Sequence, residues 1–199
     1  GAVMSMFASF QPDVVVHLAA QAGVRHSVKS PMDFVKSNLN GFANVLDACK
    51  HCEVQEFLYA SSSSVYGSRT DAPFKETDRC DTPESFYAAT KIANEVMAQA
   101  YFAQYKSPSL GLRFFTVYGP WGRLDMAPLL FAQKMRKRQT IQLFGDGLLK
   151  RDFTFVGDTI FAITRLIELG VSRQGVDVVN VGHSNPIQVT DFVKILSEC

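Results

Sequence analysis

The sequence predicts an α/β fold, with a parallel sheet in its first part and a smaller mixed lobe toward its C-terminal end. Short apolar runs alternate with longer segments of helical periodicity, and this order is typical of right-handed crossovers on a parallel sheet. Beyond residue 118 the segments are shorter, and a glycine-containing turn joins two of them. We therefore expect a sheet domain over 1–118 and a second lobe over most of 119–199, with 151–182 returning to the sheet.

The regular pattern begins with a valine-rich strand. Residues 13–18 form a short apolar run after Pro12, which suits a strand that is buried on both faces. Apolar residues then recur at helical spacing over 32–49, so we expect a helix with one face on the sheet. A second strand is predicted over 56–61, where an apolar and aromatic run leads into four consecutive serines.

A second helix is predicted over 87–105, because helically spaced apolar residues follow a helix-start signal at 82–84. A third strand is expected over 110–115. The remaining predicted elements are a helix over 129–138, a strand over 140–144, a turn over 145–147, a strand over 153–156, a helix over 158–169, a strand over 176–181 and a helix over 190–198.

Composition and charge exclude several classes of protein. With 199 residues, of which 47% are hydrophobic and 20% charged, the chain is long and apolar enough to form a core. A net charge of +1 gives no general attraction to nucleic acid or to an anionic membrane. No apolar run approaches the roughly 18 residues of a spanning helix, so we expect a cytoplasmic protein. Cys49 and Cys52 have metal-like spacing, but no second such pair completes a zinc site, and we expect no metal.

Ligands of open parallel sheets bind beyond the carboxyl ends of the strands, so the residues there are the first candidates for chemistry. Three segments qualify, namely 19–25, 61–64 and 116–123. Tyr87 and Lys91 are four residues apart and share one face of the predicted helix, where the ammonium would favour the phenolate. Such a pair is a usable acid and base. The spacing alone is common, and its position after the serine-ended strand is what favours a catalytic role.

Six segments carry a resemblance to a known family. They are HLAAQAGVRHS at 17–27, NLNGFANVLDAC at 38–49, YASSSSVYG at 59–67, YAATK at 87–91, LRFFTVYGPWGR at 112–123 and FGDGLLKRDFTFVGD at 144–158. With these segments in family order, the chain resembles the extended short-chain dehydrogenase/reductase family, and within it the nucleotide-sugar epimerases, especially the UDP-glucuronate 4-epimerases. The resemblance implies a Rossmann-like sheet with a small substrate-binding lobe, NAD as the cofactor and a UDP-sugar as the substrate.

The resemblance also implies catalytic roles. Ser62 would hydrogen-bond the 4-oxygen of the sugar, Tyr87 would take the proton of the 4-hydroxyl while hydride passes to NAD, and Lys91 would hold the nicotinamide ribose. The resulting 4-keto sugar would turn over and receive the hydride on its other face, which inverts C4. The implied cofactor site consists of Leu18, Ala19, Ala20, Asn38, Tyr87, Lys91 and Phe114.

Substrate contacts are implied at Ser62 and at four further positions. Thr116 and Arg123 match residues that meet the sugar carboxylate in UDP-glucuronate epimerases. A guanidinium suits this planar anion because it can form two parallel hydrogen bonds. Arg151 matches an arginine near the diphosphate, and Gln142 would lie near the uracil. The implied activity is the NAD-dependent conversion of UDP-glucuronate to UDP-galacturonate.

Two other functions remain open at this point. A 4-epimerase of a neutral UDP-sugar, such as UDP-glucose or UDP-galactose, would keep every catalytic residue and differ in what Arg123 meets. A non-catalytic nucleotide-sugar-binding fragment is the other, because the chain lacks the GxxGxxG turn that receives the pyrophosphate in the family.

The predicted strand at 13–18 aligns with the fourth strand of the family. We therefore expect a chain that is truncated at both ends, lacks the first βα units and binds NAD poorly. Epimerases of this kind pair through two helices, so a homodimer through 32–49 and 85–105 is also expected.

Overall fold

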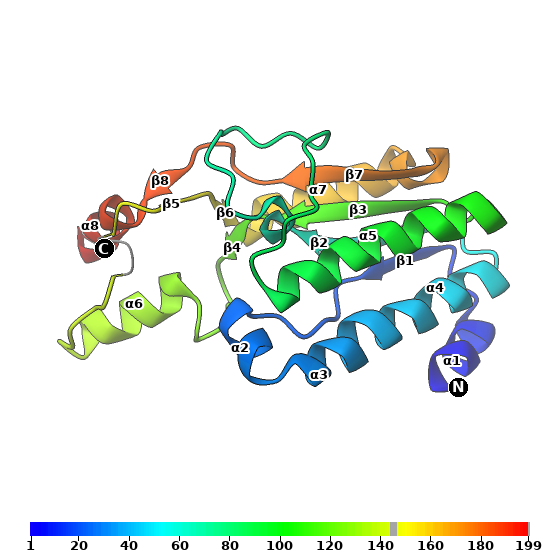
Figure 1. Cartoon of the computed structure of the whole chain (residues 1–199), viewed down its shortest axis with the longest axis horizontal. Coiled ribbons are helices and arrows are strands. Elements are labelled where there is room, and N and C mark those ends of the chain that lie inside the picture. Colours follow the sequence, from blue (N-terminus) through cyan, green and yellow to red (C-terminus); the bar gives the residue numbers. More distant parts are fainter. Residues whose placement is uncertain (144–146, 199) are drawn as a thin grey trace. The chain divides into compact units, whose positions relative to one another are not determined.

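The computed structural model of the chain describes residues 1–143 and 147–198 (Figure 1). It divides into two compact units. The first consists of Gly1–Phe114 and Thr164–Asn180, and the second of Phe115–Ile163 and Val181–Cys199. Across the described ranges, no helix is long and apolar enough to cross a lipid bilayer.

The first unit is built on a four-stranded sheet in the order β1-β2-β3-β7. β1 and β2 are parallel, as are β2 and β3, so the carboxyl ends of these three strands meet at one edge. This arrangement confirms the predicted α/β class with a parallel sheet. The strands are β1 (Val14–His17), β2 (Glu56–Ser62), β3 (Ser109–Phe114) and β7 (Val176–Val181).

Two helical connections lie side by side along the sheet (Figure 1). The first runs through α3 (Pro31–Phe34), a π-helical stretch η1 (Val35–Asn40) and α4 (Gly41–His51). The second is α5 (Phe86–Tyr105), which begins where the Ser85 hydroxyl accepts a hydrogen bond from the amide of Ala88. Both predicted helices are therefore present, and the second begins a few residues after the signal at 82–84 because Ser85 is its cap.

An aromatic cluster packs α4 against β2. The ring of Phe42 on α4 lies 5.1 Å from that of Tyr59 and 5.9 Å from that of Phe57, measured between centroids. All three side chains are fully or almost fully buried. The cluster therefore holds α4 against β2.

Two helices of the first unit were not predicted from the sequence. α1 (Ala2–Phe10) packs against α4 and buries Phe7, and α2 (Val24–Lys29) follows the loop after β1. Two single turns were also missed, η2 (Ser63–Tyr66) after β2 and η4 (Val171–Gln174) before β7. Such short elements show too few turns for a periodicity to be recognised.

The described residues of the second unit form small two-stranded sheets and helical segments. Stacked rings of Phe153 and Phe192, 4.3 Å apart, form part of its core. β4 pairs with β6 in parallel and β5 with β8 in antiparallel. Its elements are β4 (Thr116–Tyr118), α6 (Ala127–Arg136), β5 (Lys150–Arg151), β6 (Phe153–Phe155), β8 (Ile187–Gln188), α8 (Val189–Glu198) and the start of α7 (Val156–Glu168), which ends in the first unit.

The strand expected over 140–144 is wrong for the residues that the structure describes. Ile141 and Leu143 alternate with polar neighbours, which suggested a strand, but 140–143 pair with no strand in the described part of the chain. Alternation without a hydrogen-bonded neighbour does not make a strand. Residue 144 and the first two residues of the turn expected at 145–147 lie outside the described residues.

Candidate active site

The carboxyl edge of the sheet brings several predicted site residues together. Ser62 closes β2, and its partner across the ladder is Phe114, the last residue of β3. Leu18, Ala19 and Ala20 follow β1 in the loop that leaves this edge, and all three are exposed. The eight residues predicted to act in catalysis or to hold the cofactor all belong to the first unit.

Tyr87 and Lys91 lie one helical turn apart on α5, with Tyr87 against the Phe34 ring of α3 and Lys91 against β2. The Lys91 ammonium is 5.9 Å from the centre of the Tyr87 ring, and it donates a 2.7 Å hydrogen bond to the carbonyl oxygen of Ala60. Only 3% of Lys91 is exposed. Burial lowers the pKa of this amine from 10.5 to about 8, because the charged form loses its hydration. The pair therefore has the proximity that an acid/base role requires, while the roles themselves stay predictions.

Ser62 is held at the start of η2. Its hydroxyl accepts a hydrogen bond from the amide of Ser64 (3.2 Å) and donates one to the Ser64 hydroxyl (3.1 Å). Ser62 is the N-cap of η2, which explains why the strand ends at the serine run. Its hydroxyl hydrogen-bonds the Ser64 amide, which in a longer strand would bond to a neighbouring strand. Ser62 is 8% exposed, so its hydroxyl has a fixed position at the edge of the sheet.

Asn38 joins the loop after β1 to α5. Its amide oxygen accepts from the backbone of Gln21 (2.8 Å), and its amide nitrogen donates to the Gln21 carbonyl and to the Thr90 hydroxyl (both 3.0 Å). The side chain is buried. Asn38 thus fixes the loop that carries the predicted cofactor residues, and a direct contact with the cofactor stays a prediction.

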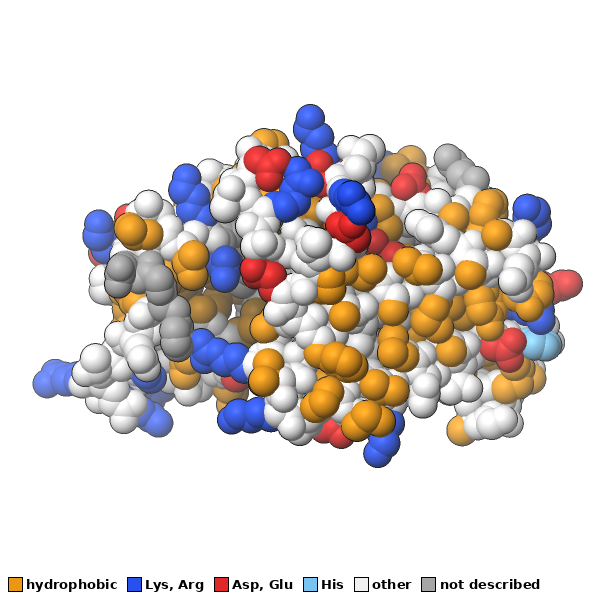
Figure 2. Space-filling view, in the orientation of Figure 1, with side chains coloured by type: hydrophobic (Ala, Val, Ile, Leu, Met, Phe, Trp, Pro, Cys, Tyr) orange, Lys and Arg blue, Asp and Glu red, His pale blue; other side chains and the backbone are white. Residues whose placement is uncertain are grey.

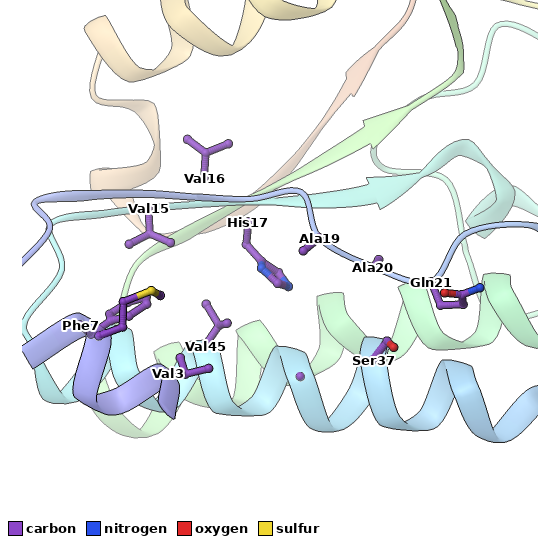
Figure 3. Close-up of a pocket in the computed structure, with 12 residues that line it drawn as sticks. Val3, Phe7, Val15, Val16, His17, Ala19, Ala20, Gln21, Ser37 and Val45 are labelled. Atoms are coloured by element: carbon purple, nitrogen blue, oxygen red, sulfur yellow. The ribbon is translucent and has the colours of Figure 1, made fainter. Parts of the chain in front are cut away.

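A cavity of about 590 Å³ runs along β1 beside this loop (Figure 3). Most of its lining is apolar, with His17, Gln21 and Ser37 as the polar members. The pKa of His17 is lowered, first because the imidazole is buried and second because Lys91 is positively charged. Ala19 and Ala20 line the same cavity, and their small side chains leave the backbone accessible. Ala19, Ala20 and Gln21 thus place the loop after β1 at this cavity, and a contact of this loop with the cofactor stays a prediction.

The other four predicted residues belong to the second unit. The amide of Thr116 donates to the carbonyl of Asp152 (3.0 Å), and Arg151 and Gln142 are exposed. Arg123 is also exposed and forms two hydrogen bonds with Asp125, at 3.0 and 2.6 Å. These bonds lower the pKa of the Asp125 carboxyl. Arg123 thus has an ordinary surface partner two residues away, and its predicted contact with a sugar carboxylate stays a prediction.

A match to a protein-family model shows which family the chain belongs to. The model of the NAD dependent epimerase/dehydratase family matches residues 1–182. The chain belongs to this family. It spans about three fifths of the length of the first curated relatives that it matches.

Relatives and solved structures of this epimerase/dehydratase family agree with the fold. A probable UDP-glucuronate 4-epimerase of Rhizobium meliloti is 39% identical over 94% of this chain and 60% of its own length. The UDP-glucuronic acid 4-epimerase of Bacillus cereus, solved with UDP-glucuronic acid and NAD, superposes with a TM-score of 0.89 at 32% identity and covers 100% of this chain and 62% of its own. The UDP-glucose 4-epimerase of Thermotoga maritima, solved with UDP-glucose, has a TM-score of 0.90 at 28% identity, over 99% of this chain and 64% of its own.

In this member of the epimerase/dehydratase family, the sequence reasoning missed a group of buried polar residues beneath the site. Ser61 and Arg113 both donate hydrogen bonds to Glu95, and Asn94 donates to the carbonyl of Asn38 (2.7 Å). One signal could have found Glu95: it lies four residues after Lys91 on the predicted helix, so helical spacing places a second ionisable side chain on the face that carries Lys91.

Proposed function

We propose that the protein that carries this chain is an NAD-dependent 4-epimerase that converts UDP-glucuronate to UDP-galacturonate. The observation that supports it most is the pairing of Tyr87 with a buried, cationic Lys91 beside Ser62 at the carboxyl edge of the sheet. Relatives and structural neighbours with UDP-sugar 4-epimerase names support the same reaction class.

In this proposal the residues of the chain bind the sugar and move one proton. Ser62 donates to the 4-oxygen by turning its hydroxyl from Ser64, and the Tyr87 phenolate takes the 4-hydroxyl proton. Lys91 keeps Tyr87 ionised and hydrogen-bonds the ribose of the cofactor. NAD, when bound, supplies the hydride acceptor and later the hydride donor. The returned hydride and the proton from Tyr87 give the inverted product with no net oxidation.

Substrate choice is assigned to Arg123. Its guanidinium would exchange Asp125 for the carboxylate of the sugar, which offers the same two acceptor oxygens. The pairing with Asp125 also motivates the alternative, a 4-epimerase of a neutral UDP-sugar, in which the surface pair persists. The likeness to a UDP-glucose 4-epimerase structure is compatible with that alternative.

Nuclear magnetic resonance of the full-length protein with UDP-glucuronate and NAD tests the proposal, because the two epimers have distinct anomeric signals. We expect UDP-galacturonate to form, and Arg123→Ala to raise KM for UDP-glucuronate by roughly 10-fold to 100-fold through loss of a charge-assisted bond. The matched control is Arg136→Ala, which removes an exposed arginine of α6 and should change KM less than about twofold. Conversion of UDP-glucose but not of UDP-glucuronate would select the neutral-sugar alternative, and conversion of neither would refute the epimerase.

We also propose that two copies pair through the helices at 32–49 and 85–105. Apolar side chains gather over α4 and α5 in Figure 2. Exposed apolar residues of the two proposed helices include Met32 (61%) and Val96 (57%). Val96→Lys should then shift the protein from dimer to monomer in sedimentation. Leu169→Lys, at an exposed apolar residue outside both helices, should not. A wild-type monomer at micromolar concentration would contradict this proposal.

A further inference from the structure

A buried cluster of a serine, a glutamate and an arginine lies directly beneath the candidate active site. Ser61 donates to Glu95 Oε1 at 2.5 Å, and Arg113 binds both carboxylate oxygens, with Nε 3.0 Å from Oε1 and Nη2 2.8 Å from Oε2. All three residues are at most 7% exposed. Such a bidentate ion pair has one preferred geometry, so it can fix the position of α5 relative to β3.

The cluster continues outward through Arg113. Its Nη1 donates to the Tyr66 hydroxyl (3.0 Å) and to the carbonyl of Glu76 (3.1 Å). The Tyr66 hydroxyl in turn donates to the side-chain oxygen of Asn180 (2.6 Å). One continuous network therefore joins β2, β3, α5, η2 and β7.

Each member of the cluster adjoins a predicted site residue. Ser61 and Arg113 are partners across the β2–β3 ladder, and the next pair of that ladder is Ser62 with Phe114. Glu95 lies one helical turn after Lys91 on α5. Lys91 donates to the carbonyl of Ala60, the residue before Ser61, so α5 is fixed to two consecutive residues of β2 just before Ser62.

We propose that Ser61, Glu95 and Arg113 are positioning residues for this site: they hold the Lys91 amine and the Ser62 hydroxyl in one fixed relation. This inference deepens the proposed function and rests on it for its catalytic consequence. A displacement of about 1 Å between reacting groups can lower the rate by as much as 100-fold. Loss of this support should therefore lower kcat even in a variant that stays folded.

A second serine, glutamate and arginine cluster lies at the other end of β2 and serves as a control for the first. Glu56, the first residue of β2, is fully buried and accepts a hydrogen bond from Ser172 (2.9 Å). Arg173 Nη2 lies 2.6 Å from Glu56 Oε1, in an ion pair whose N–H is not aligned for a hydrogen bond. This second cluster has the same three residue types and adjoins none of the predicted site residues.

The test compares Ser61→Ala with Ser172→Ala in the full-length protein. Each substitution removes one hydroxyl donor from a buried carboxylate and leaves the arginine in place, so the two melting temperatures should fall by similar amounts. We expect Ser61→Ala to lower kcat ~10-fold with KM nearly unchanged, and Ser172→Ala to leave kcat within about twofold of wild type. Equal losses of kcat in the two variants would overturn the proposal, because they would reflect stability alone.

A second readout does not depend on activity. Titration of the Lys91 side chain by NMR reports whether the amine keeps its buried position, starting from a pKa of about 8. Ser61→Ala should raise this pKa toward 10.5 by admitting water, whereas Ser172→Ala should not move it. Tyr66→Phe, which keeps the ring and removes one partner of Arg113, should give a smaller shift in the same direction.

The two readouts separate the two claims. If the wild-type protein epimerises no UDP-sugar, the proposed function fails, and the Lys91 titration still decides the positioning role. An unchanged Lys91 pKa in both Ser61→Ala and Tyr66→Phe would overturn it.

Discussion

Replacement of Lys91 by methionine should remove a pH dependence from the stability of the protein. Lys91 is buried, and its pKa falls from 10.5 to about 8 in the folded chain, so between these values the unfolded chain binds more protons than the folded one. Stability must therefore rise with pH across that window. From pH 7 to pH 9.5 the single-site linkage gives a gain of about 2 kcal/mol in the free energy of unfolding for a shift from 10.5 to about 8.

Urea denaturation of wild type and Lys91→Met at pH 7 and pH 9.5 measures this gain as a double difference. Groups that do not interact with Lys91 titrate alike in both proteins and cancel in the double difference, so the wild type should gain about 2 kcal/mol relative to the variant. Lys36→Met, at an exposed lysine, should retain the wild-type dependence. If wild type and Lys91→Met change in parallel, the amine is not held in a buried site, and the argument from burial is refuted.

Three further outcomes follow from the packing and the site. Phe42→Ala removes a ring that is 2% exposed and should lower the free energy of unfolding by about 3–5 kcal/mol in urea denaturation; a loss below about 1 kcal/mol would contradict its place in the core. Gly111→Ala would place a Cβ 2.7 Å from the Tyr59 hydroxyl and 3.0 Å from Val178, so the same assay should show a loss of about 1–3 kcal/mol, and an unchanged midpoint would show that Tyr59 moves freely. Tyr87→Phe should lower kcat at least about 100-fold in the epimerisation assay with little change in melting temperature, whereas near wild-type kcat would exclude Tyr87 as the base.

Much of the first unit was predictable because its elements are long and strongly patterned. The aromatic run of β2 was correctly predicted as a buried strand, and α5 shows a helical period over 20 residues. The valine-rich β1 was correctly predicted as a strand but not as a buried one, because it lies at the edge of the sheet and its residues are partly buried or exposed. Ser62 could be placed at the sheet edge because the serines interrupt an apolar run. The Tyr87 and Lys91 pair was predicted from its helical spacing together with its position after the serine-ended strand.

Other features depend on contacts that a sequence does not display. The π-helical stretch at Val35–Asn40 has nearly the same apolar spacing as an α-helix. β5 and β8 have two residues each, which is too short for any alternation. The bond of Glu95 to Arg113 spans 18 positions and joins α5 to β3, so it depends on helix packing that only the folded chain reveals.

The central claim is that hydride leaves C4 of the sugar and returns to the same carbon. The most direct test supplies UDP-glucuronate with deuterium at C4 to the full-length protein and analyses the product by mass spectrometry and NMR. We expect UDP-galacturonate that retains the deuterium at C4, because the transferred deuteride never exchanges with water. Product with hydrogen from solvent at C4, or no product at all, would contradict it.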